Sequence, residues 1–263
     1  MATPVRMALR LAIRQALPVL ALLAAWEVAA VGLRIPDYIL PPPHRIVLKF
    51  GQASGLLWAH TIVSVIEIAL GFLAAAMAGF LLAVAIAYSR WVERLVEPFL
   101  VVSQVIPKVA LAPLFVIWFG HGLMPKVVIA ATIAFFPVLV NTILGLKAVD
   151  AEVVELMDSI AATKRQVFWK VRLPHSLPYI FPALKVAALL AVVGAMVGEF
   201  VGSDKGLGYL MILGDVNLQT DLLFAALAVV TGVGLLLYGA VSLLHRAVLE
   251  RFGEGDTRQF ITL

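Results

Sequence analysis

The sequence contains no cysteine among its 263 residues. Disulfide bonds, thiolate metal sites and a cysteine nucleophile are therefore excluded. Histidine is also scarce, because only five are present and they stand too far apart for the spacing of metal ligands, at positions 44, 60, 121, 175 and 245. We therefore expect this chain to bind no metal and no cofactor of its own.

Motifs of known enzyme classes are missing as well. The sequence has no G-x-x-x-x-G-K-[ST] phosphate loop, no H-E-x-x-H and no G-x-S-x-G. Gly206-Leu207-Gly208 is too short for a dinucleotide fingerprint and is more typical of a turn. The apolar segments also lack the paired nucleophile and base that an intramembrane enzyme would need. We therefore expect a non-catalytic chain that does not hydrolyse ATP itself.

Charge is rare, and this excludes a water-soluble globule. Only 14% of the residues are charged and 62% are apolar, against about 45–50% apolar in ordinary soluble domains. The net charge of +4 comes from Lys and Arg scattered between apolar stretches, so a membrane explains it better than nucleic acid does.

Six apolar segments are long enough to cross a bilayer, whose hydrocarbon core requires about 20 helical residues. They cover approximately 15–33, 62–89, 99–119, 127–146, 182–201 and 222–245. Three of the segments are interrupted by charged residues, namely Glu27, Lys108, and Lys185 with Glu199, and Glu67 stands near the start of a fourth. One central charge costs about 2.5–3.5 kcal/mol, which the apolar residues of a span offset. We predict an all-α integral membrane fold with six transmembrane helices in a single domain, 1–263.

The first apolar segment resembles the start of a secretory signal peptide, because Arg6, Arg10 and Arg14 precede it. It runs on to Leu33, longer than a signal core, and no convincing cleavage site follows. We expect a retained first helix.

The distribution of Lys and Arg between the segments predicts the orientation. Thirteen lie on the side that holds both termini and the segment 147–172, and five lie on the other side: Arg34, Arg45, Lys49, Lys126 and Lys205. The positive-inside rule places the first side in the cytoplasm. On the outer side, 40–43 is stiffened by proline, and 45–58 is expected to hold a short helix, either in the membrane interface or simply on the surface.

The cytoplasmic segment 150–174 is typical of an amphipathic helix. Acidic residues crowd its start and basic residues its end, as a helix dipole favours, and four residues form one apolar strip: Val154, Met157, Ile160 and Ala161. Leu173-Pro174 is expected to end the helix, and Pro178 and Pro182 to mark an irregular return into the membrane. Such a helix is a candidate for docking a cytoplasmic partner, although it could instead fold back on the protein's own inner surface.

This segment resembles a motif of the permease subunits of bacterial binding-protein-dependent ABC importers, written roughly E-A-A, three residues, G, nine residues, then I or V, x, L-P. The matching residues are Glu155-Leu156-Met157, Ala161 at the glycine position, and Val171-Arg172-Leu173-Pro174. Both motif alanines and the glycine are replaced. Further blocks resemble the nitrate, sulfonate, taurine and vitamin-precursor branch of that family: 40–43, 105–114, 118–120, 135–137 and 206–209.

The resemblance implies an assembly in the bacterial cytoplasmic (inner) membrane. Two permease copies would carry two ATPase subunits inside, which bind ATP and magnesium, and a solute-binding protein outside. The docking residues it implies are Glu155, Asp158, Ile160, Ala161, Thr163, Leu173 and Pro174. ATP binding would draw the docking helices together and open the path outward, and hydrolysis would reset it.

Polar residues inside the spans are candidates for the translocation path: Glu67, Lys108, Asn141 and Glu199. Glu67 could equally be an interface residue that reaches toward water. Lys108, between two prolines, could form a gate or pair with Glu67. Asn141 favours a hydrogen bond between helices, and Glu199 could line the outer vestibule or meet the binding protein.

Four glycines recur at a spacing of four, at positions 194, 198, 202 and 206. They indicate close helix packing, more than a sliding surface beside the path. An ion-gradient-driven secondary transporter is the competing class, but it predicts internal repeats that we do not find. The solute stays open between nitrate, sulfonates and heteroaromatic vitamin precursors. Glu67, as an acid near the outer mouth, slightly favours the last.

Overall fold

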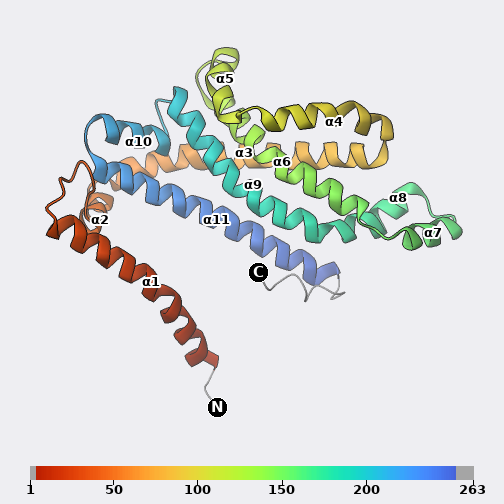
Figure 1. Ribbon diagram of the computed structural model, residues 1–263, viewed down its shortest axis with the longest axis horizontal. Coiled ribbons are helices and arrows are strands. Elements are labelled where there is room, and N and C mark those ends of the chain that lie inside the picture. Colours follow the sequence, from red (N-terminus) through yellow and green to blue (C-terminus); the bar gives the residue numbers. More distant parts are fainter. Residues whose placement is uncertain (1–3, 253–263) are drawn as a thin grey trace.

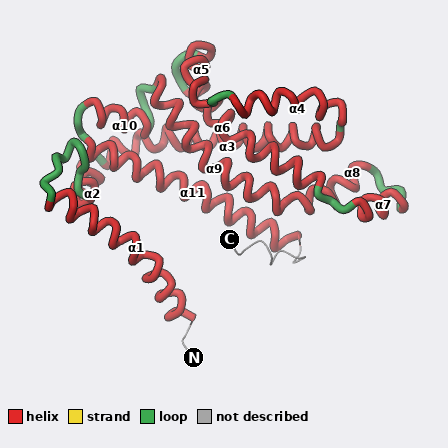
Figure 2. Tube along the Cα trace, viewed as in Figure 1, coloured by secondary structure: helices red, strands yellow, loops and turns green. Residues whose placement is uncertain are grey.

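The computed structural model describes the backbone of residues 4–252 and the side chains of residues 17–250. Within that range every regular element is a helix and no strand is present (Figure 2). The all-α prediction is therefore confirmed. Arg6, Arg10, Arg14, Arg251 and Arg258, which enter the orientation prediction, have side chains outside the described ones.

The first half of the chain holds one long divergent helix and four further helices, with a short 3₁₀ turn. Their bounds are α1 (Pro4–Gly32), α2 (Pro43–Gln52), α3 (Ser54–Tyr88), α4 (Arg90–Val105), η1 (Lys108–Leu111) and α5 (Ala112–Phe119). The second half follows with α6 (Leu123–Lys147), α7 (Ala151–Ser159), α8 (Lys164–Val167), the π-helical turn η2 (Phe168–Arg172), α9 (Leu173–Gly202), α10 (Leu207–Val216) and α11 (Thr220–Phe252).

The core is formed where α6 packs between α3 and α9, with α11 alongside α9 (Figure 1). The contacts are made by small residues, such as Ala130 and Ala134 on α6 and Ala187 and Ala191 on α9, all fully buried. Small side chains let helices approach closely, which is how helices associate when lipid removes most of the hydrophobic driving force.

Among the described residues, four helices are long and apolar enough to cross a membrane: α3, α6, α11 and the continuous helical stretch Lys164–Gly202. Helix α4 and the stretch η1–α5 pass the same test only as a pair, which is bent by 92° and brings the number to five if it is one span. The segment predicted as one span over 99–119 therefore contains a sharp break. Pro107 and Pro113 remove backbone donors, and Ile106 before Pro107 is extended (φ −69°, ψ 124°), as the residue before a proline prefers.

Leu173-Pro174 begins a helix instead of ending one. Pro174 lies in the first turn of α9, where a missing N–H is tolerated, and Pro178 and Pro182 lie inside the same helix. The prediction of an irregular return into the membrane is wrong, because the wide π-helical turn η2 carries α8 directly into α9.

The two ends of the bundle hold different small elements (Figure 1). Helices α2 and α10 lie at one end and α7 and α8 at the other, while α1 diverges from the bundle. The expected helix in 45–58 is found as α2, which buries Ile46 and joins α11 through Lys49 and Asp221, at 3.1 Å. The segment Ser54–Trp58 belongs to α3.

Candidate functional site

Helix α7 presents one apolar face to the protein and a second to the outside. Val154 and Met157 are half-buried against the protein. Leu156 and Ile160 are 62% and 65% exposed, and Val153, on the same side, is 38% exposed. We call Val153, Leu156 and Ile160 the outer strip. The predicted apolar strip therefore divides, because Ile160 lies on the outward face.

Helix α7 ends in a two-bond cap that requires a left-handed residue at Ala161. The Ala161 N–H donates to the Asp158 carbonyl at 2.9 Å and the Ala162 N–H to the Met157 carbonyl at 3.0 Å, the pattern of a Schellman motif. Ala161 has φ +53°, a region that glycine adopts without penalty and alanine does not. This explains why the related motif has glycine here.

The next helix, α8, begins at a capping box. The Thr163 hydroxyl accepts the Gln166 N–H at 3.3 Å, and the Gln166 side chain accepts the Thr163 N–H at 2.8 Å. The two caps together hold the chain in a tight corner between α7 and α8. Thr163 thus has a structural task in addition to its candidate docking role.

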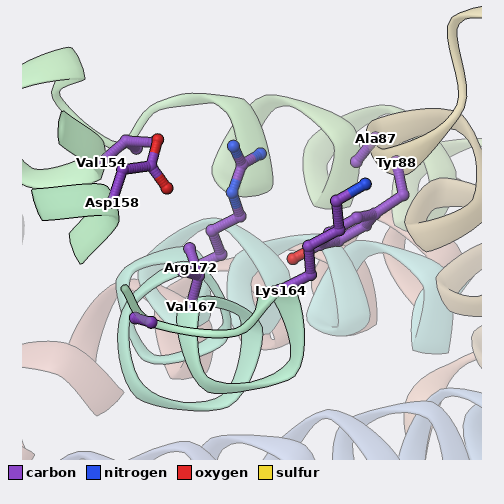
Figure 3. Close-up of a pocket in the computed structure, with 8 residues that line it drawn as sticks. Ala87, Tyr88, Val154, Asp158, Lys164, Val167 and Arg172 are labelled. Atoms are coloured by element: carbon purple, nitrogen blue, oxygen red, sulfur yellow. The ribbon is translucent and has the colours of Figure 1, made fainter. Parts of the chain in front are cut away.

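A cavity of about 270 Å³ lies between this corner and the end of α3 (Figure 3). Three charged side chains reach its wall: Asp158, Lys164 and Arg172. Arg172 lies 5.6 Å from the centre of the Tyr88 ring and donates from Nη1 to the Leu146 carbonyl at 3.4 Å. The space beneath α7 means that this helix is not packed tightly against the bundle.

The other candidate docking residues differ in exposure. Glu155 and Asp158 are exposed, whereas Leu173 and Pro174 are half-buried at the start of α9. The structure thus places Glu155 beside the outer strip, and Leu173-Pro174 away from it.

A buried polar cluster lies at the opposite end of the bundle. Lys126 Nζ on α6 donates to Glu67 Oε1 on α3 at 2.6 Å, and the two side chains are only 6% and 1% exposed. Glu67 therefore neither reaches toward water nor pairs with Lys108, and both of those interpretations are wrong. Lys126 was predicted to lie in an outer loop, and its place in this cluster was not predicted.

Glu199 on α9 belongs to the same cluster and is also 1% exposed. Its Oε1 accepts the Ser64 hydroxyl proton at 2.5 Å, and its Oε2 accepts the Gly208 N–H at 2.6 Å. Ser64 in turn accepts the Leu207 N–H at 2.8 Å. The cluster therefore joins α3, α6, α9 and the start of α10. The spacing of Ser64 and Glu67, three residues apart on one helical face, was the available signal for it.

The recurring glycines make room for these contacts. A Cβ on Gly194 would lie 2.6 Å from Ala130 Cα, and one on Gly198 would lie 2.9 Å from Lys126 Cα. Gly206 has φ +110°, and a Cβ there would collide with the Glu199 carboxylate. Tight packing, the favoured interpretation, accounts for all three positions.

Lys108 and Asn141 stand apart from the cluster. Lys108, at the break between α4 and α5, is half-buried with its ammonium 4.5 Å from the centre of the Phe136 ring. Asn141 donates from Nδ2 to the Pro137 carbonyl of its own helix at 2.8 Å. Asn141 was expected to bond to another helix, but the hydrogen bond that it makes lies within its own helix.

Residues 68–251 match the family described as binding-protein-dependent transport system inner membrane component. The chain is 38% identical to a probable ABC transporter permease protein of Haemophilus influenzae, over 86% of this chain and 93% of that one. It is 36% identical to the formylaminopyrimidine transport permease protein ThiX of Halalkalibacterium halodurans, over 88% and 92%. It is 38% identical to the riboflavin transport system permease protein RibX of Chloroflexus aurantiacus, over 87% and 86%.

The fold is also found among solved structures. A crystal structure of an amino acid ABC transporter with histidines matches with a TM-score of 0.62, covering 76% of this chain and 97% of that one. Since the two sequences are only 18% identical, this likeness concerns the arrangement of helices alone.

Proposed function

The chain belongs to the family of binding-protein-dependent transport system inner membrane components, and on this premise we propose how it works with its partners. It is the permease subunit of an ATP-driven importer and forms the path by which a small soluble solute crosses the membrane by alternating access. The observation that carries this is the family match, which spans the docking segment and the two cluster residues Lys126 and Glu199. An ion-gradient-driven secondary transporter, the competing class, is not favoured.

We propose six spans with both termini in the cytoplasm. Five are the long helices and the bent α4–α5 pair, and the sixth is α1. At 29 residues α1 is about 43 Å long, more than the ~30 Å of a hydrocarbon core. The excess of Lys and Arg around α7 and α8 supports a cytoplasmic position for that end. The α2 and α10 end would then face the solute-binding protein.

Helix α7 is our proposed docking element for the ATPase. The outer strip exposes apolar side chains on a short helix at the proposed cytoplasmic end, where a partner's groove would cover them. Glu155 beside it supplies charge for orientation. ATP and magnesium would bind to the partner subunit, so movement of α7 would be this chain's share of the energy coupling.

The proposed assembly contains two copies of this chain. Helices α4 and α5 support this, because their apolar residues are largely exposed: Phe99 is 69% exposed, Val105 is 80% exposed and Ile117 is 77% exposed. A second copy would cover part of that surface, and lipid the rest.

For the translocation path we propose the region of the α4–α5 break. A broken helix in a membrane is tolerated where its backbone is buried in protein or lines a water-filled cavity. Lys108 lies at that break, and Asn141 follows on α6 little more than one turn after Phe136. Glu67 and Glu199 are enclosed in this conformation, so the path proposal rests on Lys108 and Asn141.

The solute we propose is a heteroaromatic vitamin or vitamin precursor. ThiX and RibX, both similar over most of this chain, are named for formylaminopyrimidine and riboflavin. The earlier reason for this preference no longer holds, because Glu67 is buried in the protein and does not face the outer mouth. Thermal stabilisation of the cognate binding protein by pyrimidines and flavins, compared with nitrate, taurine and alkyl sulfonates, tests the choice.

Co-purification from membranes tests the transport class. We expect the chain to be isolated with a separate ATPase whose hydrolysis rate rises when the loaded binding protein is added. Vesicles should accumulate solute with internal ATP and without an ion gradient. Uptake by the chain alone on an ion gradient would overturn the proposal.

A further inference from the structure

The buried polar cluster holds two acids and one base. Glu67, Lys126 and Glu199 are 1%, 5% and 1% exposed, respectively. If both acids were ionised and Lys126 charged, one net negative charge would be enclosed in the protein. A net charge removed from water is strongly unfavourable unless a partner compensates it.

The hydrogen bonds of Glu199 are those of an ionised carboxylate. The Gly208 N–H donates to its Oε2 at 2.6 Å. Ser64 already accepts the Leu207 N–H, so its single hydroxyl proton is free to donate to Glu199 Oε1, at 2.5 Å. Both carboxyl oxygens therefore act as acceptors, at the start of α10, where backbone N–H groups favour negative charge.

The hydrogen bonds of Glu67 do not satisfy an ionised carboxylate in the same way. Its Oε1 accepts from Lys126 Nζ at 2.6 Å, but its Oε2 is buried with no hydrogen-bond donor among the described residues. Ser64, about one turn before Glu67 on the same helix, donates to Glu199, so the two acids belong to one buried cluster. An ionised carboxylate oxygen can only accept hydrogen bonds, so a buried Oε2 without a donor is explained if it carries a proton.

Among the described residues, Lys126 is the one cationic side chain within ion-pair distance of either carboxylate. Lys126 comes from α6 and Glu199 from α9. Helix α3 adds Ser64 and, about one turn before it, His60, whose Nδ1 faces the Gly206 backbone at 2.9 Å from its nitrogen and 3.1 Å from its oxygen. The start of α10 adds backbone amides alone.

We propose that Glu67 Oε2 is a proton-binding site, so that the cluster consists of a carboxylic acid, an ammonium and a carboxylate with no net charge. The bound proton removes the repulsion between Glu67 and Glu199 and so helps to keep α3 packed against α9 and α10. Alkaline conditions remove it and leave two like charges enclosed in one cluster. This inference is independent of the transport function, because neither solute nor partner enters it.

Infrared spectroscopy and thermal unfolding of the full chain in detergent test the proposal. We expect wild-type protein to show the carbonyl band of a protonated carboxylic acid, which shifts in D₂O. Glu67→Gln, a neutral isostere, should lose that band. Asp204→Asn, an exposed acid on the neighbouring turn, should retain it. Wild-type unfolding temperature should fall as pH rises between the ordinary carboxyl and lysine titrations, whereas that of Glu67→Gln should stay nearly constant.

Two results would overturn the site: a band that persists in Glu67→Gln, or one pH dependence shared by wild type and variant. If Glu67→Gln does not fold, the wild-type protein alone decides. A carboxylic-acid band that disappears at alkaline pH supports the proposal, and the absence of such a band at neutral pH refutes it. Glu199→Gln serves as the opposite case, since it should lower the unfolding temperature at every pH.

Discussion

Lys126 on α6 donates to Glu67 on α3 at 2.6 Å, and both side chains are closed to solvent in the cluster that includes the start of α10. The two paired residues are far apart in the sequence, and their contact connects α3 to α6. It also stands directly beside Gly198, where a side chain would displace Lys126.

Removing the ammonium should be costly. Lys126→Met leaves a buried net negative charge, and we expect the free energy of unfolding to fall by about 3–5 kcal/mol. Thermal unfolding in detergent measures this. The double variant Lys126→Met/Glu199→Gln should recover part of the loss, because the buried cluster then carries no net charge. A double variant as unstable as the single one would contradict this account.

The glycine contacts predict that α6 and α9 tolerate no added methyl group. Gly194→Ala should destabilise the protein by about 1–3 kcal/mol, because its Cβ meets the Ala130 backbone. Gly239→Ala on α11, with nothing within 4 Å, is the matched control and should be neutral or slightly stabilising. Equal unfolding temperatures for the two variants would argue against tight packing.

The cap of α7 predicts a stabilising substitution. Ala161→Gly removes a left-handed alanine, a conformation that costs an L-residue about 1–2 kcal/mol, so the corner should gain up to about 1 kcal/mol after the entropy of glycine is included. Hydrogen exchange of the α7 amides should slow. Ala162→Gly, without positive φ, should speed it instead. The same response from both variants would remove the left-handed cap as the explanation.

The outer strip predicts where the ATPase attaches. Leu156→Asp with Ile160→Asp places two charges in the proposed apolar contact, and we expect co-purification of the ATPase to fall at least about tenfold, equal to 1.4 kcal/mol. Leu218→Asp, at an exposed position with positive φ at the other end of the bundle, is the control and should leave attachment unchanged. Normal attachment of the double variant would exclude the strip as the docking surface.

Substitution of Lys108 should impair transport without impairing assembly. Lys108→Gln removes a cation that interacts with Phe136, a contact worth about 0.5–2 kcal/mol. ATP-driven uptake should change while the ATPase still co-purifies, and Lys108→Arg should retain more of the wild-type rate. Unchanged uptake by Lys108→Gln would place the path elsewhere.

The sequence predicted the elements whose cause is local. Apolar length predicted the long helices, acidic residues at its start predicted α7, and the spacing of four predicted a packed glycine face on α9. The basic residues expected at the end of the same helix lie instead in α8 and η2, because the chain turns at Ala161. The 92° bend was not predicted, because 99–119 was predicted as one span although Pro107 and Pro113 lie within it. The role of Lys126 was not predicted, because counting Lys and Arg between spans assigns a residue to a loop and takes no account of the helix that lies opposite it.

The partners of polar side chains depend on how helices are arranged in three dimensions, which periodicity does not reveal. Asn141 bonds to its own helix although a hydrogen bond between helices was favoured. Glu199 lies at the amide end of α10, a relationship set by the turn at Gly206. Sequence patterns therefore predicted the importance of these residues more reliably than they predicted their contacts.

The stretch Lys164–Gly202 is a single helical rod of 39 residues, about 58 Å long at 1.5 Å per residue. One end leaves the corner beside α7, and the other carries Glu199 close to its last turn. One run of helix therefore connects the corner beside α7 with the buried carboxylate at the far rim, although Pro174, Pro178 and Pro182 each remove a backbone donor along it. The wider π-helical turn Phe168–Arg172 lies where this run leaves the corner.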